Sequence, residues 1–135
     1  MQRIGDYVFA DFVKNVVNNE NIIMKSDGNA VRAFCYIRDA VDGYFRVMFN
    51  GQRGEAYNIG TDVDVVSIKE LANIVAGLFP ERKISVIYDI PDENKNYLKS
   101  TVIATHPDIS KARKLGFDPK VRITEGFKRT IISYL

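Results

Sequence analysis

Three side chains in the stretch 27–39 are suited to binding an anionic ligand that carries a flat ring or a sugar. Apolar and polar residues alternate from Val31 to Ile37, which predicts a β-strand. Arg32, Phe34 and Tyr36 fall on one face of this strand. A guanidinium flanked by two aromatic rings can bind phosphate oxygens while the rings contact an attached group. The alternative is that Arg32 only pairs with a surface carboxylate.

Most other kinds of catalytic or metal site are missing from the sequence. One cysteine (Cys35) and one histidine (His106) cannot build a zinc site. Cys35 is expected on the buried face of the predicted strand, and His106 in a loop, so neither is expected to catalyse a reaction. The acidic pair Asp62 and Asp64, and the pair at 92–93, are expected on the solvated surface of loops. The residues alone therefore predict a binding domain without catalytic residues.

Composition predicts a single soluble domain over residues 1–135. Hydrophobic residues make up 46% and charged residues 27% of the chain, as is usual for globular proteins. A net charge of +2 is too small to indicate nucleic-acid binding. No apolar run is long enough to span a membrane. A single cysteine fits a reducing compartment, so we expect a cytoplasmic protein.

Hydrophobic periodicity predicts alternating helices and strands. Helices are expected at about Asp6–Asn18, from Asp39 to Asn50, from Ser67, from Asp108 to Leu115, and from Thr124 to the C-terminus. Strands are expected at Ile22–Met24, Val31–Ile37, Glu55–Ile59 and Ile84–Tyr88. This order predicts an α/β fold, with a small, mostly parallel sheet covered by helices.

The first two predicted helices carry the same apolar spacing. Phe9, Phe12, Val13, Val16 and Val17 form the stripe of the first helix, and Val41, Tyr44, Phe45, Met48 and Phe49 that of the second. Such a stripe is typical of a helix face that packs against a core. We therefore expect both faces to be buried.

Five stretches of the chain, in order, resemble the extended short-chain dehydrogenase/reductases, the family of nucleotide-sugar epimerases, dehydratases and decarboxylases. The first is Asp27-Gly28 followed by Arg32-Ala33-Phe34-Cys35-Tyr36-Ile37-Arg38-Asp39. The others lie at 54–60 (Gly-Glu-Ala-Tyr-Asn-Ile-Gly), 67–72 (Ser-Ile-Lys-Glu-Leu-Ala), 108–119 (Asp-Ile-Ser-Lys-Ala-Arg-Lys-Leu-Gly-Phe-Asp-Pro) and 125–127 (Glu-Gly-Phe).

The resemblance is to the second, C-terminal half of these enzymes, which implies a substrate-binding domain that lacks most of the Rossmann domain. The glycine-rich NAD turn and the Tyr-x-x-x-Lys catalytic pair of the family's first half are absent from these residues. The resemblance therefore implies a parent enzyme that uses NAD, and a chain that by itself binds no NAD and catalyses no reaction. It leaves open whether the parent is an epimerase, a dehydratase or a decarboxylase.

The resemblance also implies substrate-binding roles for particular residues. Arg32 matches the arginine that grips the diphosphate of the nucleotide-sugar, and Tyr36 lies on its predicted face. Ser67 matches a polar position near the substrate, although capping a helix explains it as well. Lys99 replaces a second phosphate-binding arginine of the family, with Lys95 as the alternative. The strand expected to lie along the nucleotide base is Ile23, Met24 and Lys25.

The implied partners are a UDP- or dTDP-linked sugar and the missing Rossmann domain. A second reading is a non-catalytic assembly module, because a substrate domain without its Rossmann half should expose apolar surface to another copy. A third reading, a nucleic-acid module, rests on basic residues near the C-terminus. They lack interleaved aromatic residues, so we favour a solvated helix face and no nucleic-acid partner.

Overall fold

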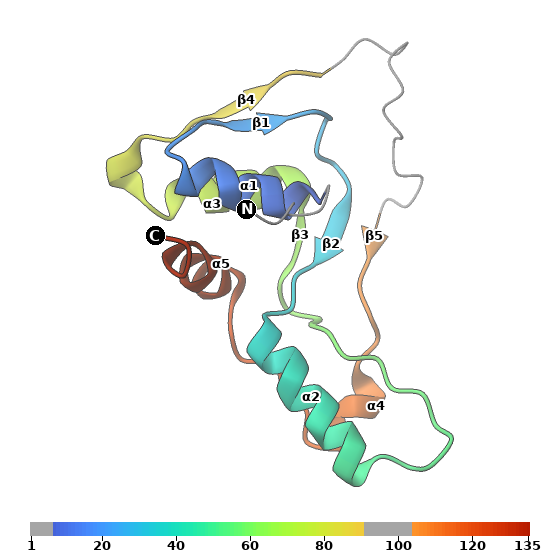
Figure 1. Ribbon diagram of the computed structural model, residues 1–135. Helices are drawn as coiled ribbons and strands as arrows, with labels where there is room; N and C mark the ends of the chain where they lie inside the picture. Colours follow the sequence, from blue (N-terminus) through green and yellow to red (C-terminus); the bar gives the residue numbers. More distant parts are fainter. Residues whose placement is uncertain (1–6, 91–103) are drawn as a thin grey trace.

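The computed structural model describes residues 7–90 and 104–135. Its helices are α1 (Val8–Val17), α2 (Ile37–Asn50), α3 (Ile68–Gly77), α4 (Ser110–Arg113) and α5 (Ile123–Ile132), with a short 3₁₀ turn, η1 (Pro80–Arg82). Its strands are β1 (Ile22–Met24), β2 (Val31–Ala33), β3 (Val65–Ser67), β4 (Val86–Tyr88) and β5 (Ala104–Thr105). Helices α1, α3 and α5 gather near β1 and β4, whereas α2 and α4 form an arm that extends away from them (Figure 1).

The strands form two small sheets. In the first, β1 pairs with β4 in parallel. In the second, β2 lies between β3 and β5, antiparallel to β3 and parallel to β5. Two of the three strand pairings are thus parallel, which confirms the α/β fold with mostly parallel pairing. The short strand β3 was not predicted from the sequence.

The main core lies where α1, α3 and α5 pack beside β1. Its largest fully buried side chains include Phe12, Met24 and Leu71. The predicted stripe of α1 is confirmed for three of its five members, because Phe12, Val13 and Val16 are buried, whereas Phe9 is 42% exposed. Helix α1 therefore turns its apolar face toward α3 and α5, and Phe9, in its first turn, is the exposed member of the stripe.

Gly28 sits in the turn between β1 and β2 with a left-handed φ of +70°. Its carbonyl oxygen accepts a hydrogen bond from the Lys69 backbone N–H at 3.0 Å, and the Ala30 carbonyl accepts one from Ile68 at 3.0 Å. The turn is thereby fastened to the first residues of α3. This connection fixes where β2 begins.

Gly28→Ala is expected to lower the free energy of unfolding by about 1–2 kcal/mol, because a side chain strains a left-handed backbone. A Cβ at this position would also come within 2.6 Å of the Met24 methyl and 2.9 Å of the Lys69 nitrogen. The matched control is Gly77→Ala, where a Cβ would meet no atom within 4 Å. Urea denaturation of both variants tests this expectation, and equal midpoints would contradict it.

The predicted strand Val31–Ile37 is wrong beyond Ala33. Pairing with β3 ends at Ala33↔Val65, and the Tyr36 carbonyl instead accepts the N–H groups of Asp39 and Ala40 in the first turn of α2. Tyr36, not Asp39, is therefore the N-terminal cap residue of α2. Ile37, expected on a buried strand face, is 66% exposed.

Several other predicted boundaries also differ. Glu55–Ile59 is not a strand, because no neighbouring strand lies beside it in the described part of the chain. The helix predicted from Asp108 is only the single turn α4. The last helix begins at Ile123, so Thr124 lies inside it instead of capping it.

The prediction that the α2 stripe is buried is also wrong. Its members Tyr44, Phe45, Met48 and Phe49 are 53–74% exposed. Helix α2 packs through its opposite face, where a Cβ on Gly43 would come within 2.7 Å of Ile59 and 3.0 Å of Phe117. Apolar spacing thus identified the helix correctly but not the face that the described residues cover.

Ser67 opens α3 with a capping box. Its hydroxyl accepts the Glu70 backbone N–H at 3.1 Å, and the Glu70 carboxylate accepts the Ser67 backbone N–H at 2.7 Å. The Ser67 hydroxyl also donates to that carboxylate at 2.8 Å. These hydrogen bonds satisfy N–H groups that a helix start leaves without partners.

The capping box predicts that α3 becomes less stable as the pH falls. The backbone N–H and the hydroxyl of Ser67 lower the pKa of the Glu70 carboxyl below its usual 4.5. A carboxyl whose pKa falls on folding stabilises the protein above the unfolded pKa, and this contribution is lost as pH falls through the lower folded pKa. Glu70→Gln is therefore expected to lower Tm at pH 7 and to flatten the fall in Tm between pH 5 and 3. Thermal melts of both proteins across this range measure the effect, and parallel pH profiles would contradict it.

Candidate functional site

Arg32 lies on β2, the middle strand of its sheet. Its backbone is opposite Val66 on β3 and opposite Thr105 on β5. The side chain is half-buried, and its Nη1 donates to the Val31 carbonyl at 2.7 Å. Strands on both sides therefore fix the position from which the guanidinium projects, which favours a pre-organised contact over a mobile surface charge.

The predicted base-binding strand is β1, whose three residues have different environments. Met24 is buried in the main core, and its carbonyl accepts the Asp89 N–H at 2.9 Å. Ile23 is 38% exposed, and Lys25 also faces solvent. Only the side chains of Ile23 and Lys25 can contact a ligand, whereas the Met24 side chain packs into the main core.

Of the remaining predicted residues that the structure describes, Ser67 lies opposite Val31 on the neighbouring strand β3, and Tyr36 lies after the end of β2. Ser67 is used by the capping box, so a structural role accounts for its hydroxyl. Tyr36 lies beyond the end of β2, where the strand alternation has stopped, and it enters a separate pocket with Phe34. Lys99 and Lys95 lie outside the described residues.

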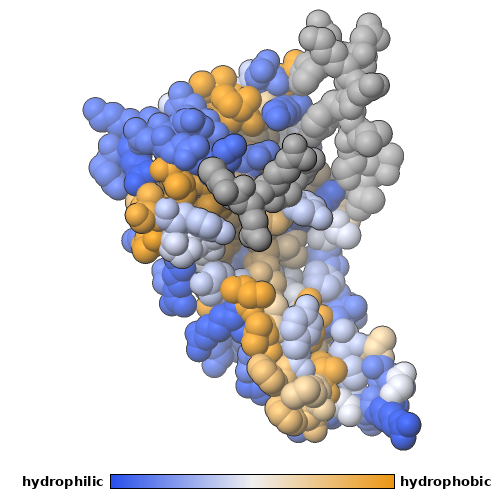
Figure 2. Space-filling model, viewed as in Figure 1, coloured by the Kyte–Doolittle hydropathy of each residue, from blue (hydrophilic) through white to orange (hydrophobic). Residues whose placement is uncertain are grey.

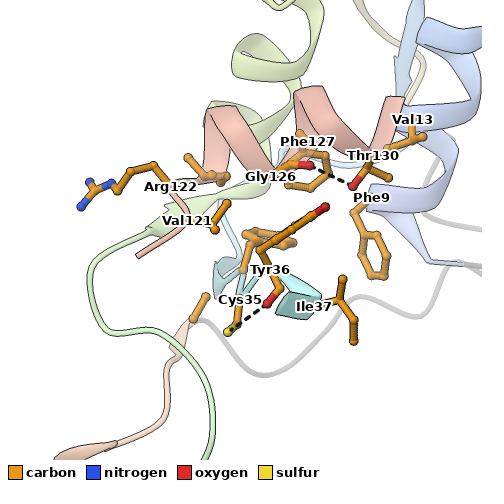
Figure 3. A pocket seen from close by; sticks show the side chains of 13 residues that line it. Phe9, Val13, Cys35, Tyr36, Ile37, Val121, Arg122, Gly126, Phe127 and Thr130 are labelled. Atoms are coloured by element: carbon orange, nitrogen blue, oxygen red, sulfur yellow. Dashed lines mark hydrogen bonds between the residues drawn. The ribbon is translucent and has the colours of Figure 1, made fainter. Parts of the chain in front are cut away.

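An apolar pocket of about 360 Å³ lies between α1, the end of β2 and α5 (Figure 3). Its aromatic wall is a chain of edge-on contacts, with ring centroids 6.4 Å apart for Phe9 and Phe34 and 5.9 Å apart for Phe34 and Phe127. The Tyr36 ring packs on α5 at Gly126, where a Cβ would approach within 3.1 Å of the ring. Rings and aliphatic groups dominate this pocket, which suits an apolar group more than a phosphate.

Two buried carboxylates position the pocket wall formed by residues 121–123. Asp39 is 6% exposed and accepts the backbone N–H groups of Lys120 and Val121, at 2.9 and 2.7 Å. Asp64 is 5% exposed, accepts the Ile123 N–H at 2.6 Å and pairs with Arg122 at 3.0 Å. The surface-loop prediction for Asp64 is therefore wrong, because its carboxylate anchors the start of α5. The apolar neighbours Val63 and Val65 are the signal in the sequence that could have indicated its burial.

Asp64→Ala is expected to lower the free energy of unfolding by roughly 1–2.5 kcal/mol, because it leaves the Ile123 N–H without its acceptor. Asp62→Ala is the control: Asp62 pairs with Arg113 at 2.7 Å, but both side chains are more than one-third exposed. Exposed pairs contribute less than about 1 kcal/mol. Chemical denaturation measures both changes, and an Asp64 variant no weaker than the Asp62 variant would contradict this account.

Cys35 lines the pocket without the properties of a reactive thiol. Burial raises the pKa of this thiol, and the negative charge of Asp39 raises it further. The thiolate, which is the nucleophilic form, is therefore scarce at neutral pH. Cys35 lies after the end of β2 and is half-buried, so its predicted place on the buried face of a strand is wrong. That Cys35 is not a nucleophile stays a prediction.

Comparison with known proteins identifies relatives of this chain. The model of the NAD dependent epimerase/dehydratase family matches residues 2–60. UDP-glucuronic acid decarboxylase 6 of Arabidopsis thaliana is 33% identical over 121 residues, which cover 88% of this chain and 32% of that protein. The chain is a relative of the NAD-dependent epimerases and dehydratases.

Members of the NAD-dependent epimerase/dehydratase family also share the fold. A structure of UDP-glucose 4-epimerase from Thermotoga maritima with UDP-glucose superposes with a TM-score of 0.78 and 27% identity, over 95% of this chain and 39% of that one. The dTDP-D-glucose 4,6-dehydratase of Mus musculus is 29% identical over 136 residues. The chain spans about a third of the length of the curated relatives that it matches.

The described residues do not fit the NAD that this family uses. Dinucleotide phosphates bind at a glycine-rich turn before a helix whose first N–H groups are open. Here the sequence has no glycine-rich turn before a helix, the Glu70 carboxylate is part of the capping box that opens α3, and the Asp64 carboxylate accepts the first N–H of α5. Within residues 7–90 and 104–135, no cluster of metal-binding side chains occurs, and no helix has the length and apolar character needed to cross a membrane.

Proposed function

We propose that the chain is the C-terminal, nucleotide-sugar-binding part of an NAD-dependent sugar epimerase, dehydratase or decarboxylase. The observation that carries this proposal is the superposition, over 95% of the chain, on an epimerase solved with UDP-glucose. Relatives named for UDP-glucuronic acid and dTDP-D-glucose support the same ligand class, a sugar joined to a nucleoside diphosphate.

The ligand is proposed to bind across β1 and β2. Ile23 and Lys25 face solvent on β1, where a nucleotide base can lie along the strand. Arg32 then reaches the diphosphate from the middle strand of the second sheet. A planar guanidinium binds phosphate oxygens through two parallel hydrogen bonds and stays charged at any physiological pH.

These residues bind and orient the substrate, and the chemistry belongs to NAD when it is bound by the rest of the enzyme. The chain contains neither the glycine-rich turn nor a tyrosine followed four residues later by lysine. We therefore propose that the chain alone binds nucleotide-sugars without converting them.

Calorimetric titration tests this proposal. UDP-glucose, UDP-glucuronic acid and dTDP-glucose are each titrated into the chain, with uridine as the control that lacks phosphate. We expect saturable binding of at least one nucleotide-sugar and at least roughly tenfold weaker binding of uridine, because a hydrogen bond to a charged group contributes about 1.5–3 kcal/mol. The proposal would be refuted if none of the three nucleotide-sugars bound, or if uridine bound as tightly as they do.

A further inference from the structure

Strand β4 has one open edge. It pairs in parallel with β1, and no other strand of the described residues pairs with it. The Ser85 carbonyl accepts a hydrogen bond from β1, and the Asp89 N–H donates one to β1, both at 2.9 Å. Because successive residues of a strand point their hydrogen-bonding groups to opposite edges, Val86 and Tyr88 turn their backbone N–H and C=O groups to the open edge.

The same strand carries exposed apolar side chains. Ile87, Tyr88 and Ile90 are 43%, 45% and 53% exposed. Figure 2 shows an apolar patch at the upper end of the molecule, where Figure 1 places β1 and β4. An apolar strand edge with unpaired backbone groups is a template on which a further strand can pair. Strand β4 is therefore a candidate surface for binding another chain.

An open groove lies beside the first half of this edge. It has a volume of about 470 Å³ and lies between the end of α3 and the start of β4, where Ile84 and Val86 line it. Both side chains are half-buried and pack against the main core. At Gly77, which also lines the groove, an added Cβ would meet no atom within 4 Å. The groove therefore has room for a side chain from an added strand.

Two opposite charges flank the open edge. Lys83 precedes β4 and Asp89 follows it, and both side chains are exposed. Neither forms an ion pair with another residue of the described ranges 7–90 and 104–135. When two copies of such a segment run antiparallel, the positive end of each meets the negative end of the other. The charges of this segment are therefore complementary to those of a second copy.

We propose that the open edge of β4 binds a second copy of this chain, with the two β4 strands antiparallel about a two-fold axis. The pairing joins the two β1–β4 sheets into one sheet that continues across both copies. Because the paired segment is short, the interface belongs to the small, reversible class. The open edge lies on the side of β4 away from β1, where the nucleotide-sugar is proposed to bind, so this proposal does not depend on the proposed function.

One register satisfies the backbone groups and the charges together. When Val86 lies opposite Val86 of the second copy, Ile84 lies opposite Tyr88. In the same register Lys83 lies opposite Asp89, and the two-fold symmetry repeats both pairs. The groups at the open edge then exchange hydrogen bonds as in an antiparallel sheet, and each Tyr88 ring lies beside Ile84 at the groove of the other copy. A shift to the next register in either direction moves the two charges apart.

The first test measures the dimer and the amides that it covers. Sedimentation of the 135-residue chain at roughly 1 to 500 μM is expected to show a reversible monomer–dimer equilibrium. Residue-resolved hydrogen exchange at the two ends of this range is expected to slow at least about tenfold for the Val86 and Tyr88 amides. The Asp89 amide, already bonded to β1, should change little. A monomer at every concentration, or a dimer without this alternation, would overturn the proposal.

Charge reversal tests the register. Lys83→Asp or Asp89→Lys alone places like charges opposite each other and is expected to raise the dimer Kd at least about tenfold. The double variant exchanges the two charges and is expected to return the Kd to within about threefold of the original value. Aspartate tolerates the left-handed backbone at position 83, where φ is +52°. Single variants that dimerise normally, or a double variant that does not recover, would overturn the register.

Phe49→Ser is the control for a different contact between copies. Phe49 is 74% exposed on α2, which Figure 1 shows on an arm remote from β4. If β4 forms the interface, this substitution is expected to leave the dimer Kd unchanged. Loss of the dimer in this variant would place the second copy on α2 and would overturn the proposal.

Discussion

Phe12→Ala is expected to lower the free energy of unfolding by about 3–5 kcal/mol, the cost of deleting a buried aromatic side chain from a core. Phe12 is 1% exposed and lies among the buried residues that join α1 to α3 and α5. Since small domains are stabilised by only about 5–15 kcal/mol in total, this variant should unfold at much lower denaturant concentration. Urea denaturation followed by circular dichroism measures the change.

Phe9→Ala is the matched control, in the same helix and with the same atoms removed. Phe9 is 42% exposed, although its ring meets Phe34 edge-on at 6.4 Å. We expect a loss of less than about 1.5 kcal/mol, because much of this ring is already in water. Equal losses at the two positions would mean that the core lies on a different face of α1.

Arg32→Ala is expected to weaken nucleotide-sugar binding by about 1.5–3 kcal/mol, which is roughly 10- to 150-fold in Kd. The reason is the loss of a charged donor held on the middle strand between β3 and β5. Because the side chain is half-buried, the variant is first checked for an unchanged melting temperature. Calorimetric titration with UDP-glucuronic acid then measures the affinity.

Arg38→Ala is the control for charge alone. Arg38 belongs to the same sequence motif but is exposed on α2. The substitution removes one positive charge that lies on α2 and not on β2. We therefore expect less than about a threefold change in Kd, and this change should become smaller as salt is added. A loss at Arg38 as large as that at Arg32 would indicate general attraction of an anion instead of a specific diphosphate contact.

The sequence allowed the fold class to be predicted because α/β order depends on local periodicity. The α1 stripe and the Ser67 capping box were both readable from short stretches and are both present. Whether the apolar stripe of α2 is buried could not be predicted from the sequence. Its spacing matches that of α1, but what covers a helix face is decided by the body beside it, which periodicity does not describe.

The candidate site was predictable in its parts but not in its assembly. The motif around Arg32 located the guanidinium on a strand, yet the strand is shorter than the alternation suggested, so Tyr36 and Phe34 line a separate pocket. The anchoring roles of Asp39 and Asp64 depend on backbone groups more than 50 residues away in the chain. Contacts of this range are set by tertiary structure, and no local pattern encodes them.

The most direct test of the central claim is to follow the amide signals of the chain by NMR as UDP is added. Binding of the diphosphate by Arg32 predicts that the largest shift changes fall on residues 22–25 and 31–33, together with the Arg32 side-chain N–H. They should be saturable and absent when uridine is added instead. No saturable change, or changes confined to the apolar pocket at Phe127 and Thr130, would contradict it.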